Sequence, residues 1–391
     1  MAIRILYILN CTSRSSGANK AFFSLLKGMQ SSDYELAVVV PDAMDVYSDL
    51  QRMGIKTYVL DFVFNIYPVI YRPKTVLAFV PRLFSTIIKN SKAKKRLAQI
   101  VDEFQPDIIH SNSSVIGVGF DVAKKKGIPH IYHFREYADK IPVHFLPSQA
   151  SFLKKIQTDN SFIICIVKDM IDHYHLTANK NAIAVYDGVS YKRSFTESAT
   201  NGSYFLFVGR IEPIKGLLEL MKAYKGYVDR APEHVIPLWV VGQESHLAYT
   251  AKVKSYIRDN GLEEYVVFLG ERNDMDALYQ SALAMIISSL YEGFGLCMPE
   301  AMFNSCLCIG RNVAGTKEQF DNGVALSGSE IGLRFETEEE LSAILYDVST
   351  HPEGYYEMRK RALSVVNQLY SIESYAHNVK RLYQTIIDNK K

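Results

Sequence analysis

The residues best suited to chemistry are two carboxylates, Glu292 and Glu300, which bracket a glycine-containing turn. An apolar run that is typical of a buried strand precedes them, and Gly293 and Gly295 supply backbone conformations closed to other residues. Pro299 suits the first turn of a helix, so we expect Glu300 to be ionised, fixed and exposed. Such a carboxylate can accept hydrogen bonds from a ribose diol, and the free amides beside it suit phosphate. The alternative is that both acids merely cap a helix.

A second segment, residues 209–216, follows one predicted strand and leads into a predicted helix. Arg210 and Lys215 would flank the helix N-terminus, so two cations and free amides converge where a pyrophosphate could bind. The alternative is that these cations form surface salt bridges with Glu212 or Glu219, which contribute little to stability. The predicted diol-binding carboxylate lies in the same half of the chain, and this favours the phosphate-binding interpretation.

Length and composition define the class of protein that can carry these motifs. The chain has 391 residues, of which 48% are hydrophobic and 22% charged, so we expect a globular protein of two domains. The net charge of +2 argues against general nucleic-acid binding. Five cysteines without a Cys-x-x-Cys pair indicate neither a disulfide framework nor a zinc site, and we expect a cytoplasmic location. No apolar run approaches the length of a membrane-spanning helix, and no signal peptide is expected.

Strand-forming runs alternate with helical sequence in both halves of the chain. In the first half these runs are residues 3–9, 36–40, 57–60, 108–110, 130–133, 162–167 and 182–186. In the second half they are 204–208, 237–241, 266–269 and 282–287. The alternation predicts α/β domains with parallel sheets covered on both faces. A polar segment without periodicity, residues 190–202, predicts the linker between them.

One segment, residues 62–101, contains no acidic residue. Its cations are Arg72, Lys74, Arg82, Lys89, Lys92, Lys94, Lys95 and Arg96, and among them stand Tyr67, Tyr71, Phe79, Phe84, Ile87 and Ile88. A basic segment with aromatic and aliphatic residues can lie on an anionic bilayer surface or hold an acidic acceptor. A well-solvated surface helix explains the same composition equally well.

The two motifs together resemble the signature of retaining nucleotide-sugar glycosyltransferases of the group-1, or family-4, type. The matching features are the basic turn 209–216 and the pair Glu292 and Glu300 with seven residues between them. By this resemblance Arg210 and Lys215 bind the donor diphosphate and help the leaving group depart. Glu300 holds the ribose hydroxyls, and Glu292 faces the donor sugar. The other expected donor-binding residues are Gly17, Gly209, Gly293, Phe294 and Gly295.

The resemblance covers almost the whole chain and implies the GT-B architecture, two facing Rossmann-like α/β domains with a cleft between them. Residues 1–190 would form the acceptor-side domain and residues 203–370 the nucleotide-sugar-binding domain. The helix in 371–391 is expected to pack back on the first domain.

Further segments match the family less closely. Ser16 replaces the first glycine of the family's Gly-Gly loop, and Asp187 stands in place of the asparagine of an Asn-Gly-Val site. His133 ends a strand where relatives often place a histidine near the transferred sugar, and we assign it a catalytic role. Its alternative role is that of a core histidine. Acceptor or sugar contacts are expected from Ser16, Arg135, Glu136 and Thr316.

We expect neither a catalytic metal nor a cofactor. Asp274-Met-Asp276 looks like the Asp-x-Asp metal motif of another glycosyltransferase fold, but acidic residues are common in the first turn of a helix. Arg210 and Lys215 can neutralise the diphosphate in place of a metal ion. We also expect no covalent carboxylate nucleophile, since the resemblance favours departure and attack on the same face.

The sequence thus predicts a retaining transferase that moves a sugar from a nucleotide diphosphate to a glycan or lipid-linked acceptor. The resemblance favours UDP over GDP, and it points to bacterial surface polysaccharide synthesis, with residues 62–101 as a contact to the inner face of the membrane. A sugar-nucleotide epimerase or a phosphorylase on the same fold is an alternative. A non-catalytic sugar-nucleotide-binding subunit is another, although the complete set of Arg210, Lys215, Glu292 and Glu300 speaks against it.

Overall fold

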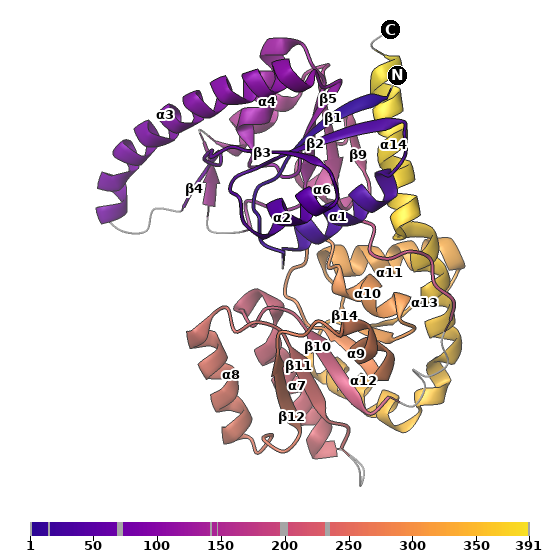
Figure 1. The fold of residues 1–391 in the computed structure, drawn as a ribbon. Coiled ribbons are helices and arrows are strands. Elements are labelled where there is room, and N and C mark those ends of the chain that lie inside the picture. The colour runs from indigo at the N-terminus through magenta and orange to yellow at the C-terminus, as the bar shows by residue number, and fades with distance from the viewer. Residues whose placement is uncertain are drawn as a thin grey trace. The chain divides into compact units, whose positions relative to one another are not determined.

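A computed structural model of the protein describes residues 2–14, 16–68, 73–140, 143–146, 148–195, 202–230 and 235–389. Its contacts divide the chain into two compact units (Figure 1). Unit 1 comprises residues 1–188 and 375–391, and unit 2 comprises residues 189–374. Each unit contains a parallel sheet with helices on both faces, so the predicted α/β class with two Rossmann-like domains is confirmed.

The main sheet of unit 1 has the strand order β3-β2-β1-β5-β6-β8-β9, and all its neighbours pair in parallel. Its strands are β1 (Ile3–Ile8), β2 (Tyr34–Val40), β3 (Lys56–Val59), β5 (Ile108–Ser111), β6 (His130–Phe134), β8 (Ser161–Cys165) and β9 (Ala182–Ala184). The central strands β5, β6 and β8 are buried along their whole length because helices cover both faces. The order reverses between β1 and β5, which places a topological switch point at their carboxyl ends.

The helices of unit 1 form two cores, one on each face of the sheet. The helices of unit 1 are α1 (Gly17–Met29), α2 (Asp45–Arg52), α3 (Pro73–Phe104), α4 (Gly117–Lys126), α5 (Gln149–Ile156), α6 (Asp169–His173) and the greater part of α14 (Ile372–Asp388). Of these, α1, α2 and α14 contribute to one core, and α3 and α4 contribute to the other. α1 buries Phe22, Leu25, Leu26 and Met29 on one face, as the apolar periodicity predicts. A small antiparallel pair, β4 (Ile66–Pro68) and β7 (Val143–Phe145), has no counterpart in the sequence prediction.

The last helix, α14, joins the core of unit 1 alongside α1 (Figure 1). Tyr375, Val379 and Tyr383 repeat at helical spacing and are fully buried there. The Tyr383 hydroxyl lies 2.8 Å from the Tyr7 hydroxyl and 2.7 Å from Nδ1 of His110. Unit 1 is therefore assembled from two separate stretches of the chain.

The chain enters and leaves unit 2 at adjacent points. Ser190 and Ser371 form an isolated parallel bridge. The Val189 amide donates to the Tyr370 carbonyl at 2.9 Å, and the Ile372 amide donates to the Ser190 carbonyl at 2.9 Å. The two ends of unit 2 are thus held together by backbone hydrogen bonds between residues 189–190 and residues 370–372. The sequence predicts an irregular linker over 190–202, and residues 196–201 of it lie outside the described residues.

The sheet of unit 2 has the strand order β12-β11-β10-β13-β14-β15, again with parallel pairing. Its strands are β10 (Tyr204–Val208), β11 (Leu238–Val241), β12 (Val266–Gly270), β13 (Ala282–Ile287), β14 (Leu307–Arg311) and β15 (Leu333–Phe335). Its helices are α7 (Leu217–Arg230), α8 (Leu247–Asp259), α9 (Met275–Ser281), α10 (Cys297–Phe303), α11 (Ala314–Ser327), α12 (Glu338–Thr350) and α13 (Tyr356–Leu369). Thr337 caps α12 in a capping box with Glu340. The strand order reverses between β10 and β13.

No helix in the described parts of the chain combines the length and the apolar character needed to cross a bilayer.

Buried histidines make the stability of unit 1 depend on pH. Burial lowers the pKa of His130 to about 3, although the carboxylate of Asp121 acts in the opposite direction. Unfolded histidine has a pKa of about 6.5, so the unfolded chain takes up the proton first and stability is lost as pH falls below that value. We expect the free energy of unfolding to drop by about 2 kcal/mol between pH 7 and pH 5 on account of His130 alone.

Urea unfolding at the two pH values measures this drop. His130→Phe should reduce the pH dependence, whereas His377→Gln, a change at an exposed position of α14, should leave it unaltered. An equal pH dependence in wild type and His130→Phe would show that His130 is not responsible.

Candidate functional site

The two sequence motifs begin at the carboxyl ends of the adjacent strands β10 and β13. In open parallel sheets, ligands bind in the crevice that forms where the strand order reverses, because the two following loops leave the sheet in opposite directions. The loop after β10 carries Arg210 and Lys215, and the loop after β13 carries Glu292. The fold of unit 2 thus brings residues far apart in the sequence to one edge of the sheet.

Lys215 and Glu292 form an ion pair, with 2.7 Å between Nζ and Oε2. Their side chains are only 21% and 12% exposed. The Ser289 hydroxyl donates a second hydrogen bond to the same carboxylate oxygen at 2.9 Å. Burial acts to lower the pKa of Lys215, but the neighbouring Glu292 carboxylate outweighs it and the pKa is raised. Lys215 is therefore a fixed, partly desolvated cation.

Close backbone packing holds Lys215 in this position. Gly216 has a φ of +64°, and a Cβ there would lie 2.1 Å from the Ser288 carbonyl oxygen. The Ser288 hydroxyl donates to the Lys215 carbonyl at 3.0 Å, and the Leu290 amide donates to the Ile214 carbonyl at 2.8 Å. The basic turn and the loop after β13 are thus joined by hydrogen bonds on both sides of Lys215, and only glycine fits between them.

Arg210 is the more exposed of the two cations. Its guanidinium lies 2.9 Å from Oε1 of Glu212, and its side chain is 63% exposed. The Arg210–Glu212 pair is one that the salt-bridge alternative names, whereas Lys215 pairs with Glu292 and not with Glu212 or Glu219. An exposed pair of this kind contributes little to stability. The guanidinium also has five N–H donors, so an incoming anion can bind without loss of the Glu212 contact.

Glu300 lies in the first turn of α10, as predicted, but the helix begins at Cys297, before Pro299. The Tyr279 hydroxyl donates to Oε2 of Glu300 at 3.0 Å. Burial and the nearby Glu300 carboxylate raise the pKa of Tyr279 well above its ordinary value, so the hydroxyl stays protonated. The prediction of an exposed Glu300 is wrong, because the carboxylate is half-buried beside Tyr279. It is nevertheless fixed, and its second oxygen remains available.

The segment between the two glutamates is held through its backbone. Phe294 is buried with its ring 5.2 Å from that of Tyr370, and the Gln319 amide donates to the Phe294 carbonyl. The side chain of Phe294 thus serves the packing of unit 2. Gly295 has a φ of +77°, and a Cβ there would lie 2.7 Å from Cγ of Glu292. The glycine therefore leaves room for the Glu292 side chain.

The N-terminus of α11 packs against the same segment. The Gly315 amide donates to the Glu292 carbonyl at 3.1 Å, and a Cβ on Gly315 would lie 1.8 Å from the Gly293 carbonyl oxygen. Ala314 has a φ of +42°, which is unusual for a residue with a side chain. Thr316 is buried, and its side chain lies near Gly310. Its expected contact with acceptor or sugar stays a prediction.

Two candidate residues of unit 1, Ser16 and Gly17, follow β1. Ser16 is the N-cap of α1 without a capping hydrogen bond from its side chain, and Gly17 is the first helical residue. Asn19, fully buried, donates to the carbonyls of Cys11 at 3.1 Å and Ser13 at 2.9 Å. This side chain holds the loop that precedes Gly17 at the switch point of unit 1. Whether Ser16 and Gly17 contact a ligand stays a prediction.

His133 lies on β6 and is fully buried. Its Nδ1 is 3.2 Å from Nε2 of His110, and its Nε2 has no hydrogen-bond partner among the described residues. Burial, with Arg135 and His110 nearby, lowers the pKa of His133 well below its ordinary value, so the ring is neutral. This position matches the alternative of a core histidine, and the catalytic role stays a prediction.

Arg135 and Glu136 are both engaged within unit 1. The Arg135 guanidinium donates to both carboxylate oxygens of Asp187 at 2.7 and 2.8 Å and to the Tyr375 hydroxyl at 2.9 Å. Glu136 accepts hydrogen bonds from the Ser113 and Ser114 hydroxyls at 2.6 and 2.8 Å. These contacts tie together β6, α14 and the loop after β5. The predicted acceptor contacts of Arg135 and Glu136 stay predictions.

The sequence motifs left out several residues that shape the site. Ser289 is the second residue after β13, and its place at the carboxyl end of a strand is a signal that could have identified it. Tyr279 and Gln319 lie outside both motifs, on α9 and α11, and no short spacing connects them with their partners.

The Asp274-Met-Asp276 sequence has a structural explanation in unit 2. Asp274 pairs with Arg272 at 2.6 Å, and Asp276 pairs with Arg193 at 3.0 Å. Within the described ranges, no group of three or more His, Cys, Asp or Glu side chains is placed to hold a metal ion. The metal independence of the reaction stays a prediction.

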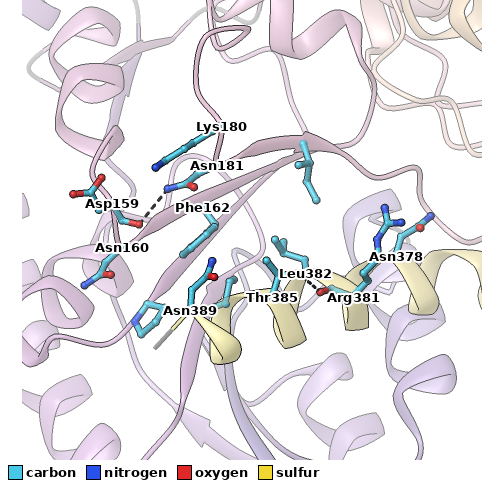
Figure 2. Close-up of a pocket in the computed structure, with 13 residues that line it drawn as sticks. Asp159, Asn160, Phe162, Lys180, Asn181, Asn378, Arg381, Leu382, Thr385 and Asn389 are labelled. Carbon is cyan, nitrogen blue, oxygen red and sulfur yellow. Dashed lines mark hydrogen bonds between the residues drawn. The ribbon is translucent and has the colours of Figure 1, made fainter. Parts of the chain in front are cut away.

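A cavity of about 550 Å³ lies in unit 1, away from these motifs (Figure 2). Asn160 and Asn181, directly before β8 and β9, line one wall, and Arg381 and Thr385 of α14 line another. The cavity therefore lies at the amino ends of the strands, whereas ligands of doubly wound sheets bind at the carboxyl ends. None of the predicted site residues lines it.

Comparison with known proteins connects both halves of the chain to one family. Residues 191–364 match the model of "Glycosyl transferases group 1", and residues 16–176 match that of "Glycosyl transferase 4-like domain". The chain is similar to the UDP-Gal:alpha-D-GlcNAc-diphosphoundecaprenol alpha-1,3-galactosyltransferase of Escherichia coli, with 24% identity over 340 residues that cover 75% of this chain and 84% of that protein. It is also similar to the O-antigen chain mannosyltransferase RfbU of Salmonella typhimurium, with 28% identity over 159 residues, or 40% of this chain and 43% of that protein.

Solved structures share the fold over the whole chain. Anabaena Alr3699/HepE in complex with UDP superposes with a TM-score of 0.77 at 17% identity, covering 98% of this chain and 100% of that one. A glycosyltransferase from Rickettsia africae superposes with a TM-score of 0.78 at 17% identity, covering 99% of both chains.

Proposed function

Because the chain belongs to the group-1 glycosyltransferases and has their GT-B fold, we propose that it transfers a sugar from a nucleoside diphosphate donor to a lipid-linked glycan with retention at the anomeric carbon. The observation that carries this proposal is the arrangement at the switch point of unit 2. There Lys215 and Arg210 offer cationic charge beside Glu292, and Glu300 offers a fixed carboxylate.

In the proposed reaction the bond between the anomeric carbon and the β-phosphate oxygen breaks, and the acceptor hydroxyl attacks from the same face. The leaving nucleoside diphosphate takes the electron pair, and the acceptor proton passes to its phosphate oxygen. Negative charge thus develops on the diphosphate, where Lys215 and Arg210 stabilise it. Glu292 holds the ammonium of Lys215 before the donor binds, so the cation needs little reorganisation.

Relatives suggest the class of donor and acceptor. The Escherichia coli relative is named for UDP-Gal and for a diphosphoundecaprenol-linked acceptor, and the Anabaena structure is a complex with UDP. We propose a UDP-sugar in preference to a GDP-sugar, and an isoprenoid-diphosphate-linked glycan at the inner face of a bacterial membrane. Surface polysaccharide synthesis is the corresponding process.

A panel of sugar nucleotides tests the proposal. Incubation of the protein with a UDP- or GDP-sugar and a lipid-linked acceptor should release the free nucleoside diphosphate in step with glycolipid formation. An epimerase would instead change the sugar without release of diphosphate, and a phosphorylase would require inorganic phosphate. A thermal-shift screen of nucleoside diphosphates selects the base, since a ligand that binds only the folded state raises its stability. If no sugar nucleotide or diphosphate binds, the proposal is wrong.

Replacement of Glu300 by glutamine should weaken donor binding. A hydrogen bond to a charged group contributes about 1.5–3 kcal/mol, so we expect KM for the sugar nucleotide to rise about 10- to 100-fold with a smaller change in kcat. Tyr279→Phe, which removes the hydroxyl that orients Glu300, should have a weaker effect in the same direction. Glu264→Gln, at an exposed position of unit 2, serves as the control. A pure loss of kcat in Glu300→Gln would contradict the role in ribose binding.

A further inference from the structure

α3 exposes a row of large apolar side chains. Val80, Phe84, Ile87 and Ile88 are each more than half exposed. Their spacing places them on one face of the helix, because residues three and four apart are neighbours on a helix surface. We call these four residues the α3 stripe. Single exposed apolar residues are common, but four adjacent ones on one helix face are typical of an interaction site.

The packing of α3 within unit 1 does not use this face. Ala93, Leu97 and Ile100 of its C-terminal part are buried in the core on one side of the sheet. Asn90 is buried, exchanging two hydrogen bonds of 2.9 Å with the backbone of Val63. Nearer the N-terminus, the Phe79 ring lies 4.8 Å from that of Tyr67. The helix thus has an inner apolar face that packs and a separate outer one, the α3 stripe.

Cations adjoin the α3 stripe. Lys92 and Lys95 follow Ile88 by four and seven residues and so lie on the same side of the helix as the α3 stripe. Arg82 is two residues from both Val80 and Phe84 and lies on the opposite side. All three cations are exposed and form no ion pair with a described residue. Lys89 lies 3.7 Å from Asp61 in an exposed pair, and Lys94 pairs with Asp121. From residue 62 to 101 the chain has no acid that could neutralise them. Of the cations in this segment, Arg72 lies outside the described residues, and so does the side chain of Lys74.

We propose that the α3 stripe and its adjoining cations dock unit 1 on an anionic lipid bilayer. The four apolar side chains would enter the boundary between head groups and acyl chains, while Lys92 and Lys95 bind the lipid phosphates. A second copy of the chain is the weaker choice of partner. An α3 stripe opposed to itself would bring two acid-free, cationic segments together.

The docking surface places the enzyme where a lipid-linked acceptor resides, but it depends on no residue of the donor site. The proposal therefore stands or falls independently of the proposed reaction. Lys215→Ala should bind vesicles as wild type does, whatever its activity.

Vesicle flotation tests the docking surface directly. The full chain should float with phosphatidylcholine–phosphatidylglycerol vesicles at low salt and not with phosphatidylcholine alone, and high salt should weaken the binding. The variant Phe84→Ser/Ile87→Ser/Ile88→Ser should lose about a hundredfold in partition, because the apolar area that enters the bilayer is removed. Lys92→Gln/Lys95→Gln should lose about fivefold for each cation removed.

Two control variants make the same kinds of substitution at exposed positions outside α3. Leu247→Ser/Leu326→Ser removes exposed leucines of unit 2, and Lys124→Gln/Lys125→Gln removes exposed cations of α4. Both should float as wild type does. All altered side chains are exposed, so thermal unfolding should be unchanged, and transfer to a water-soluble acceptor should also persist.

A tryptophan at position 84 reports on insertion. The natural chain has one tryptophan, Trp239 in unit 2, so its signal is a constant background. Phe84→Trp should show a blue-shifted emission with anionic vesicles and none with phosphatidylcholine vesicles. The proposal is overturned if wild type fails to float at low salt, if the triple serine variant floats like wild type, or if the tryptophan emission does not shift. A dimer in solution that the triple serine variant abolishes would assign the α3 stripe to a second copy instead.

Discussion

Replacement of Lys215 by alanine is expected to lower kcat/KM for the sugar nucleotide about a thousandfold. The Nζ atom forms an ion pair with Glu292, and the packing of Gly216 against Ser288 fixes the backbone next to Lys215. If it stabilises the departing diphosphate, its loss removes an interaction that strengthens in the transition state, so kcat should fall with kcat/KM.

The measurement is the initial rate of nucleoside diphosphate release at several donor concentrations. Lys215→Arg keeps the charge and should recover part of the rate. Lys222→Ala serves as the matched control, since Lys222 forms an exposed pair with Glu338 in the same unit. Circular dichroism should show the same helical content in all variants. Activity of Lys215→Ala within about threefold of wild type would exclude Lys215 from the catalytic site.

Removal of Arg135 should have the largest effect on stability. The Arg135–Asp187 pair has side chains that are only 4% exposed, and the guanidinium also donates to Asn112 and to Tyr375. In Arg135→Met the Asp187 carboxylate would remain buried without its partner, which typically costs about 3–5 kcal/mol.

Denaturant unfolding of unit 1 measures this loss. Arg135→Met/Asp187→Leu should be more stable than Arg135→Met alone, because the double variant leaves no unpaired buried charge. Lys126→Met is the control, since the pair of Lys126 with Asp102 is much more exposed and its loss should barely shift the unfolding midpoint. An unfolding midpoint of Arg135→Met equal to that of wild type would contradict the structural role of the pair.

Elements with a strong local signal were predictable from the sequence. β10 and β13 occupy the predicted residues, because a continuous apolar run of that length is typical of a buried parallel strand. β15, β4 and β7 each have only three residues, which is too short for an alternation of apolar and polar residues to be recognised in the sequence. β14 and α11 were also missed.

The site was predictable in its residue types but not in its contacts. The spacing of Glu292 and Glu300 follows from a strand, a turn and a helix start, which are local features. The pairing of Glu292 with Lys215 depends on β13 lying next to β10, and the sheet order is a property of the whole unit. The burial of His133 and the pairing of Arg135 with Asp187 likewise depend on helices and strands distant in sequence.

Unit 2 has the organisation of an inserted domain, because backbone hydrogen bonds hold its two ends together. Ser190 and Ser371 form a β-bridge, and unit 1 resumes at Tyr375. Unit 2 is therefore one continuous segment inserted into the sequence of unit 1. Residues 189–374 can therefore be expressed as one uninterrupted polypeptide. Residues 1–188 cannot be separated so simply, because a simple truncation would remove Tyr375 and Tyr383 from the core. Residue 188 must instead be spliced to residue 375 through a short linker, so that each half can be produced and titrated with ligand alone.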